Sequence, residues 1–339
     1  MGEFDLIERF FRQKAAAALA AQASSAPNSV ALGIGDDCAL LQPAPGMQLA
    51  VSTDMLVEGR HFFADVDPAA LGHKALAVNL SDLAAMGAEP LAFTLALALP
   101  PERAQDAPWL DALSDGMLAL AREHACPLVG GDTTAGPLNL CITVFGQVPA
   151  GQALRRGGAR VGDDLWVSGT LGDARLALGA LRGEWALSAS ALALARARLE
   201  RPTPRLALGR CLRGLATSAI DISDGLVGDV EHILKASGVG AEIDVGAVSS
   251  LMAIRRLPAS AGYPNDAPVL QSAALAGGDD YELAFTAPAP QRAAVEAAAR
   301  QAGTPVARVG RICTAPGLRL LDAHGQALTR ELHGFDHFA

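Results

Sequence analysis

Apolar residues recur at helical spacing in the first half of the chain, and short strand-like runs separate these stretches. The spacing predicts helices over residues 4–23, 68–86 and 108–124. Gly87 follows the second of them directly and is suited to end it, since glycine takes the left-handed conformation at low cost.

Strands are predicted between these helices. Residues 39–42 and 48–54 flank Pro43-Ala-Pro-Gly46, which is typical of a β-hairpin. Further strands are predicted over residues 91–99, over 128–129 leading into a Gly-Gly-Asp turn, and over 138–148. The order of strands, helix, strand, helix, strands indicates an α+β domain.

The run Leu91–Leu99 is apolar on both faces of the predicted strand. One set of alternate positions carries Leu and Phe, and the other carries Ala and Thr. A sheet covered by helices on one side only would show polar residues on the other. We expect the second face to be buried against a partner subunit, with burial inside one chain as the equal alternative.

Residues 149–163 are rich in Gly and Arg and form the best candidate domain boundary, which predicts domains over residues 1–150 and 151–339. Beyond it, strands alternate with helices, as in a layered α/β domain. The predicted strands cover residues 165–168, 219–222, 241–245, 281–286, 306–309 and 317–321. The predicted helices cover residues 173–181, 187–199, a stretch after 204, 226–236 and 288–302.

Composition narrows the class of protein. The chain has 339 residues, half of them hydrophobic, so a sizeable core is expected. Its longest strongly apolar stretch, Leu91–Leu99, is too short to span a bilayer, and residues 2–11 lack a signal-peptide layout. A cytoplasmic protein is expected. A net charge of −9 argues against nucleic acid as the main partner.

Six short acidic motifs carry the candidate chemistry. They are Gly33-Ile-Gly-Asp-Asp37, Ser52-Thr-Asp54, Asn79-Leu-Ser-Asp82, Gly130-Gly-Asp132-Thr-Thr134, Asp221-Ile-Ser-Asp224-Gly225 and Gly277-Gly-Asp-Asp280-Tyr-Glu282. Any one of them alone is most simply a turn. Together they predict clustered carboxylates, whose hard oxygen atoms favour Mg²⁺ and, through it, phosphates.

The cationic equipment for phosphate is limited. Only Lys14, Lys74 and Lys235 are lysines, and neither a G-x-x-x-x-G-K-[ST] loop nor a G-x-G-x-x-G motif occurs. Phosphate binding would therefore rest on metal ions, main-chain N–H groups and Arg. Arg155-Arg156 is the best cationic candidate, with a solvated linker as the even alternative.

Three further positions are open at this stage. Asp221 and Asp224 could share one metal ion, or Asp224 could N-cap the helix after it; we favour both at once, with Asp221 as a ligand and the Asp224 turn presenting N–H groups to phosphate. His61 lies just past the Ser-Thr-Asp motif, although a lone His is more often structural. Phe335 would either join the core or stack on a ligand ring.

The six motifs, in this order and spacing, resemble the thiamine-monophosphate kinase family, and the match covers essentially the whole chain. Further matching segments are Lys74–Gly87, Ser218–Leu226 and Gly334–Phe338. The resemblance implies a two-domain fold like that of aminoimidazole ribonucleotide synthetase, with homodimers formed through the N-terminal sheets. It also implies transfer of the γ-phosphoryl group of ATP to thiamine phosphate, giving thiamine diphosphate.

The resemblance implies a set of site residues. Mg²⁺ would be held by Asp37, Ser52, Thr53, Asp54, Asp82, Asp132, Asp221 and Asp224. ATP would be held by Gly131, Asp132, Arg156 and Ser223. The thiamine moiety would face His61, Asp279 and Phe335. The family commonly has Glu in place of Asp279, and Tyr or Trp is frequent in place of Phe335.

The predicted chemistry needs no general base, because a phosphate monoester has a second pKa near 6 and is largely ionised at neutral pH. Two other classes of protein remain as rivals. One is another Mg–ATP-dependent synthetase with a different acceptor, although a selenophosphate synthetase would carry a reactive Cys near the N-terminus and residues 2–29 contain none. The other is a nucleotide-binding module without catalysis.

Overall fold

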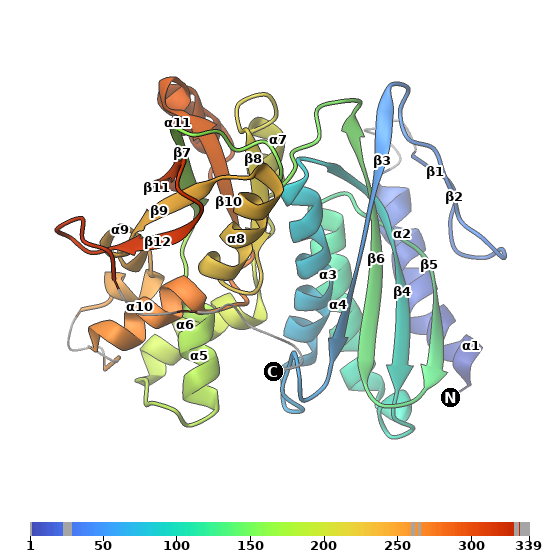
Figure 1. Ribbon diagram of the computed structural model, residues 1–339. Coiled ribbons are helices and arrows are strands. Elements are labelled where there is room, and N and C mark those ends of the chain that lie inside the picture. The colour runs from blue at the N-terminus through green and yellow to red at the C-terminus, as the bar shows by residue number, and fades with distance from the viewer. Residues whose placement is uncertain (1, 23–28, 259–261, 264–265, 329–331, 333–339) are drawn as a thin grey trace. The chain divides into compact units, whose positions relative to one another are not determined.

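The computed structural model describes residues 2–22, 29–258, 262–263, 266–328 and 332 (Figure 1). The chain forms two compact units. The first unit comprises Met1–Leu83 and Ala88–Gly151, and the second comprises Ala84–Gly87 and Gln152–Ala339. None of the described helices combines the length and the apolar character that crossing a membrane requires.

The first unit is built on a four-stranded sheet in the order β3-β6-β4-β5, in which only the pairing of β4 with β5 is parallel. Its elements are α1 (Glu3–Leu6), the π-helix η1 (Ile7–Arg12), α2 (Gln13–Gln22), β1 (Val30–Leu32), β2 (Leu40–Leu41), β3 (Met47–Val57), α3 (Pro68–Ala85), β4 (Glu89–Leu99), η2 (Arg103–Gln105), α4 (Ala107–Glu123), β5 (Leu128–Ala135) and β6 (Asn139–Pro149).

Helix α3 packs on one face of this sheet, here called the inner face, where Leu83 lies against Gly146 of β6. A Cβ at Gly116 of α4 would meet the carbonyl oxygen of Ala69 of α3 at 1.9 Å, so glycine allows the two helices to pack closely. The opposite face, the outer face, exposes large apolar side chains of β3. Leu49, Val51 and Met55 are 49%, 55% and 52% exposed.

Several predicted elements of this unit are confirmed. Helices cover residues 3–22, with a π-helical segment in the middle, and α3 ends as expected at Gly87. Gly87 has φ of 64°, its N–H bonds to the carbonyl of Ala84, and the N–H of Ala88 bonds to that of Leu83. This pair of bonds is a Schellman motif, which satisfies the last carbonyl groups of the helix.

Two strand predictions are wrong. β2 does not form a hairpin with β3, because β2 pairs with β1 while β3 pairs along its whole length with β6. Nor does the chain turn at Gly130-Gly131-Asp132, since β5 continues through them in register with β4. A Cβ at Gly131, which has φ of 152°, would meet the carbonyl oxygen of Leu95 at 1.9 Å. The glycine therefore permits close strand pairing.

The second unit contains a six-stranded sheet in the order β12-β9-β11-β7-β10-β8. Its elements are β7 (Asp163–Ser168), α5 (Asp173–Leu181), α6 (Ala189–Glu200), α7 (Leu206–Cys211), β8 (Ser218–Ile222), α8 (Leu226–Ser237), β9 (Gly240–Asp244), α9 (Val245–Ser249), η3 (Ala253–Arg256), α10 (Ala267–Ala276), β10 (Glu282–Pro288), η5 (Ala289–Gln291), α11 (Arg292–Gln301), β11 (Val306–Cys313) and β12 (Gly317–Leu321). Only β9 and β12 pair in parallel, so the helices and strands alternate along the chain around a mostly antiparallel sheet.

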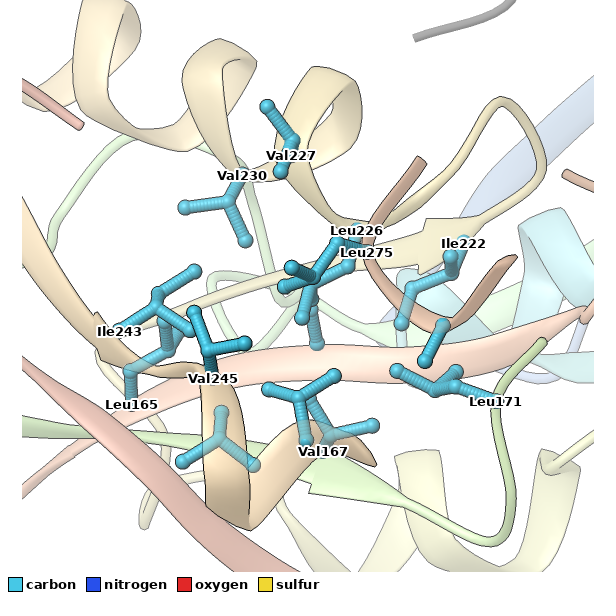
Figure 2. Close-up of a cluster of buried hydrophobic side chains, with 14 of the residues drawn as sticks. Leu165, Val167, Leu171, Ile222, Leu226, Val227, Val230, Ile243, Val245 and Leu275 are labelled. Carbon is cyan, nitrogen blue, oxygen red and sulfur yellow. The ribbon is translucent and has the colours of Figure 1, made fainter. Parts of the chain in front are cut away.

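The core of the second unit lies between this sheet and helices of the same unit (Figure 2). Val167 of β7 and Ile222 of β8 are fully buried, as are Leu226 and Val230 in the first turns of α8. Leu275 of α10 joins the same cluster. This packing fixes the end of β8 and the start of α8, the connection that carries the Asp221–Gly225 motif.

Candidate active site

The Ser-Thr-Asp motif lies in the middle of β3 and places two of its side chains on the inner face. There the hydroxyl of Ser52 donates to a carboxylate oxygen of Asp82 on α3 at 2.5 Å. The main-chain N–H of Asp54 donates to the side-chain oxygen of Asn79 at 3.0 Å. Asn79 and Asp82 are three residues apart, so one face of α3 presents both to the strand.

Thr53 points the other way, because successive side chains of a strand alternate between faces. Its hydroxyl lies 2.8 Å from that of Thr143 on the outer face. Asp132 is on this outer face too, since it pairs with Ala96 in the row of the sheet that also contains Met55. The structure therefore groups Ser52, Asp54 and Asp82 on one face, and Thr53 and Asp132 on the other.

A cavity of about 150 Å³ lies beside β5. Asp37, Gly131 and Asp132 line it, together with Ile7 and Phe11 of the π-helix η1. Asp36, which precedes Asp37, has a local role: one of its carboxylate oxygens accepts the N–H of Asp37 at 2.9 Å. The cavity thus combines a polar wall from three residues of the predicted site with an apolar wall, as ligand pockets commonly do.

His61 lies in the turn that follows β3. Its Nδ1 accepts the main-chain N–H of Val57 at 3.0 Å, and its own carbonyl oxygen accepts from Nζ of Lys74 at 3.5 Å. A ring nitrogen that accepts a hydrogen bond carries no proton, so neutral His61 keeps its proton on Nε2. It can therefore donate a hydrogen bond to a ligand only through Nε2.

In the second unit, the Asp221–Gly225 motif connects β8 to α8. Asp221 is buried near the end of the strand, and Ser223 and Asp224 are half-buried. Asp224 is not the N-cap of α8, because Gly225 occupies that position and no side chain caps the helix. The N–H groups of Ser223 and Asp224 donate to Oδ2 of Asp229 at 3.0 and 3.1 Å. Asp229 thus accepts from the two amides that the sequence predicts to face phosphate, and that prediction stays untested.

The loop before β10 lies directly against this connection. The N–H of Asp279 donates to the carbonyl of Ser223, and the N–H of Tyr281 donates to that of Ile222, each at 2.8 Å. Asp279 and Tyr281 have φ of 66° and 50°, which few residues other than glycine adopt. The Tyr281 hydroxyl donates to Asp279 at 3.4 Å. The backbone therefore holds Asp279 beside Ser223.

The other acidic residues of this loop have structural roles. Asp280 is buried, and both of its carboxylate oxygens accept the N–H of Gly172, at 3.0 and 2.9 Å. Burial raises the pKa of Asp280 well above its ordinary value. Glu282 is fully buried and accepts from Arg205 in a two-pronged contact, from Arg198 at 2.8 Å and from the Ser168 hydroxyl at 2.6 Å.

Arg156 is exposed in a loop that is attached to the same region. The carbonyl of the preceding residue, Arg155, accepts the N–H of Ala219 at the start of β8, and Ser237 at the end of α8 accepts the N–H groups of Gly158 and Ala159. The guanidinium of Arg156 is close enough to Asp229 to lower the pKa of that carboxyl, although burial dominates and raises it to about 7. The loop is therefore bonded to β8 and α8 and is not a free linker.

The donor set suits a hard cation. Carboxylate and hydroxyl oxygens are the ligands that Mg²⁺ prefers, and Ser52, Asp54 and Asp82 present them on the inner face within the first unit. Over the described part of the chain, however, no three His, Cys, Asp or Glu side chains are gathered tightly enough to hold a metal ion by themselves. Magnesium with few protein ligands usually also binds substrate phosphates. Phe335 lies outside the described residues.

Sequence reasoning missed two residues of these sites. Asn79 belongs to the Asn79–Asp82 motif, and its distance of three residues from Asp82 is the signal that both face β3. Asp229 lies in the first turn of α8, where an acidic residue is common. Nothing in its spacing from Asp224 indicates that it reaches back to the loop.

Comparison with known proteins identifies the fold and then the family. The family models described as AIR synthase related protein, N-terminal domain, and AIR synthase related protein, C-terminal domain, match residues 35–148 and 160–322. The two-domain fold of aminoimidazole ribonucleotide synthetase-like proteins is thus confirmed. Thiamine-monophosphate kinase of Salmonella typhimurium is 45% identical to the chain, over 100% of the chain and 98% of the relative.

Solved structures of related proteins are similar to this chain over most of its length. The crystal structure of thiamine-monophosphate kinase from Stenotrophomonas maltophilia has a TM-score of 0.81 and 43% identity, and covers 94% of this chain and 98% of its own. AaThiL complexed with AMPPCP and TMP has a TM-score of 0.72 and 28% identity, over 88% and 89% of the two chains. The chain belongs to the thiamine-monophosphate kinase family.

Proposed function

We propose that this chain transfers the γ-phosphoryl group of ATP to thiamine phosphate, giving thiamine diphosphate and ADP, as the last step of thiamine diphosphate biosynthesis. The observation that carries the proposal is the full-length similarity to thiamine-monophosphate kinases. A solved relative binds both TMP and AMPPCP, an analogue of ATP. The chemistry is expected to take place in the cytoplasm.

In the proposed reaction, a phosphate oxygen of thiamine phosphate attacks the γ-phosphorus of ATP, and the bond from that phosphorus to the bridging oxygen of ADP breaks. The attacking oxygen is already ionised at neutral pH, so no side chain has to remove a proton. The contacts of His61 agree with this. Its unprotonated ring nitrogen, Nδ1, already accepts the main-chain N–H of Val57 and is therefore not directed at a substrate proton. Positioning and charge compensation are then the main tasks of the protein.

The acidic residues would meet these tasks by holding Mg²⁺. Bound Mg²⁺ offsets the charge on the phosphates and stabilises the charge that develops during transfer. Ser52, Asp54 and Asp82 would hold it in the first unit on the inner face of the sheet, with Asp37 and Asp132 beside β5. In the second unit, Asp221 and Asp224 would contribute further oxygens. Thr53 would take part through its main chain, because its hydroxyl lies on the outer face.

The remaining assignments follow the local geometry. Gly131 and Asp132 border the cavity beside β5, which supports a contact with ATP. Arg156 and Ser223 both lie in the second unit, where each is linked to Asp229, and would bind the phosphates of ATP. His61 would donate from Nε2 to the thiamine phosphate, and Asp279 and Phe335 would contact the thiamine moiety. The active form is proposed to be a homodimer.

Release of ADP with different acceptors tests this function against its rivals. With Mg–ATP, we expect ADP to form when thiamine phosphate is present and not with thiamine or without an acceptor. ADP formation with another acceptor alone would indicate a different synthetase. ATP binding without turnover on any acceptor would indicate a binding module and contradict the proposal.

A further inference from the structure

Asp229 has no assigned role, yet its side chain bonds directly to the loop that carries Ser223 and Asp224. It lies in the first turn of α8, with only 4% of its surface exposed. Its Oδ2 accepts the main-chain N–H groups of both loop residues, at 3.0 and 3.1 Å. One carboxylate oxygen thus connects the helix to two successive residues of the proposed ATP and metal site.

The loop also makes main-chain hydrogen bonds to the segment before β10. The carbonyls of Ile222 and Ser223 accept from Tyr281 and Asp279. Gly225, with φ of 109°, turns the chain into α8, and a Cβ there would meet the carbonyl carbon of Ala276 at 2.7 Å. The amides of Ser223 and Asp224 both point to the same oxygen of Asp229. Asp229 therefore determines how these two residues are oriented.

Helix capping does not account for a buried carboxylate at this position. A first-turn acidic residue that only stabilises the helix dipole is usually exposed and contributes a few tenths of a kcal/mol to about 1 kcal/mol. Asp229 is instead buried, and burial makes a carboxylate costly to desolvate. Its two N–H donors and the nearby guanidinium of Arg156 offset part of that cost.

We propose that Asp229 is a positioning residue that holds the Ser223–Asp224 loop in the conformation that binds Mg–ATP. The proposal rests on the roles proposed above for Ser223 and Asp224. In the opposite arrangement, the Asp229 carboxylate would occupy amides that an ATP phosphate needs, and would weaken binding. The two arrangements predict changes of opposite sign when the carboxylate is removed.

Steady-state kinetics of two variants and a matched control separate these arrangements. Asp229→Ala removes both hydrogen bonds, and Asp229→Asn keeps an oxygen that can accept them. The control is Asp322→Ala, because one oxygen of Asp322 accepts two N–H groups, from His324 and Gln326, in a turn without site residues. Folding of each variant is checked by thermal unfolding.

We expect Asp229→Ala to raise the KM for ATP and the Mg²⁺ concentration for half activation by on the order of tenfold, since both side-chain hydrogen bonds to the loop are lost. The KM for thiamine phosphate should change less than twofold. Asp229→Asn should restore both parameters to within about threefold of the parent protein, as an intact acceptor predicts. Asp322→Ala should leave them unchanged.

An unchanged KM for ATP in Asp229→Ala would overturn the proposal, and so would a lowered one. If the alanine variant does not fold, hydrogen exchange of the parent protein decides. Slow exchange of the Ser223 and Asp224 amides supports the proposal, and exchange at the rate of an open loop overturns it. The Ser223→Ala variant distinguishes a failure of the proposed ATP-binding role of Ser223 from a failure of the positioning role of Asp229. A normal KM for ATP in that variant removes the assigned role of Ser223, whatever Asp229→Ala shows.

Discussion

Asp54 is the residue through which the metal proposal is tested most simply. It lies in the middle of β3, its main chain is fixed by Asn79, and Ser52 and Asp82 lie on the same face of the sheet. A carboxylate in this setting contributes negative charge and oxygen ligands, and an amide of the same shape contributes no charge. Its role in catalysis can therefore be separated from its role in folding.

We expect Asp54→Asn to abolish turnover, with a loss of at least about a thousandfold, as for the removal of an electrostatic group that stabilises the transition state. The thermal unfolding temperature should change little. Turnover is measured in saturating Mg²⁺, with the exposed Asp65→Asn as the control for charge. Near-normal activity of Asp54→Asn would remove its role as a metal ligand.

Arg156 is the cationic residue proposed to bind the phosphates of ATP in the second unit. Its loop is bonded to β8 and α8, so the side chain is exposed without being on a free linker. The guanidinium of Arg can donate two parallel hydrogen bonds to phosphate oxygens, and alanine can donate none.

Arg156→Ala should raise the KM for ATP by about tenfold, because a charge-assisted contact of 1–2 kcal/mol is lost. The matched control is Arg160→Ala, because Arg160 is also exposed and lies four residues further along the same loop. Equal KM values for both variants and the parent protein would make Arg156 a residue of the loop alone.

At the scale of elements, local signals in the sequence predict where a helix or strand lies better than they predict which strand pairs with which. The end of α3 was predictable because Gly87 and the helical spacing are local. The false hairpin at Pro43–Gly46 and the false turn at Gly130–Asp132 have a different origin. Both depend on which strand pairs with β3 or β5, and the partners, β6 and β4, are distant in the sequence.

The roles of the acidic residues before β10 also depend on contacts that are distant in the sequence. Sequence alone predicts carboxylates near Asp280, but cannot separate a ligand-binding residue from a buried one. Only packing shows that Asp280 bonds to Gly172 and that Glu282 anchors β10 to Arg198 and Arg205. The two faces of β3 were likewise not predicted, since the face of each residue depends on where α3 packs.

Arg205→Ala should reduce the free energy of unfolding by about 3 kcal/mol, because it removes one partner from a fully buried carboxylate. Urea unfolding monitored by circular dichroism measures it. Arg311→Ala is the control, since Arg311 pairs with Glu242 while 70% of its side chain is exposed. Equal effects of the two variants would show that the Glu282 pair does not anchor the element.

At the scale of the whole molecule, the outer face of the four-stranded sheet supports the prediction of a dimer. Its large apolar side chains on β3 are about half exposed in a single chain, and contiguous exposed apolar surface of this kind marks interaction sites. The two-sided apolar pattern of Leu91–Leu99 in the same sheet also predicts a second buried face.

Light scattering at micromolar concentration should give twice the chain mass of 34.7 kDa. Val51→Glu should give the single chain mass, because a charge on the outer face would be buried in the dimer without a partner. The exposed Asp65→Asn should remain a dimer. A single chain mass for the parent protein would contradict the dimer.

The central claim is that the acidic motifs support direct, Mg²⁺-dependent transfer of a phosphoryl group between two phosphates. Incubation with Mg²⁺, thiamine phosphate and ATP labelled in its γ-phosphate tests it in one measurement. We expect the label to appear in the terminal phosphate of thiamine diphosphate, one label for each ADP released, and chelation of Mg²⁺ to stop the transfer. Label released only as inorganic phosphate, or transfer that persists without Mg²⁺, would contradict it.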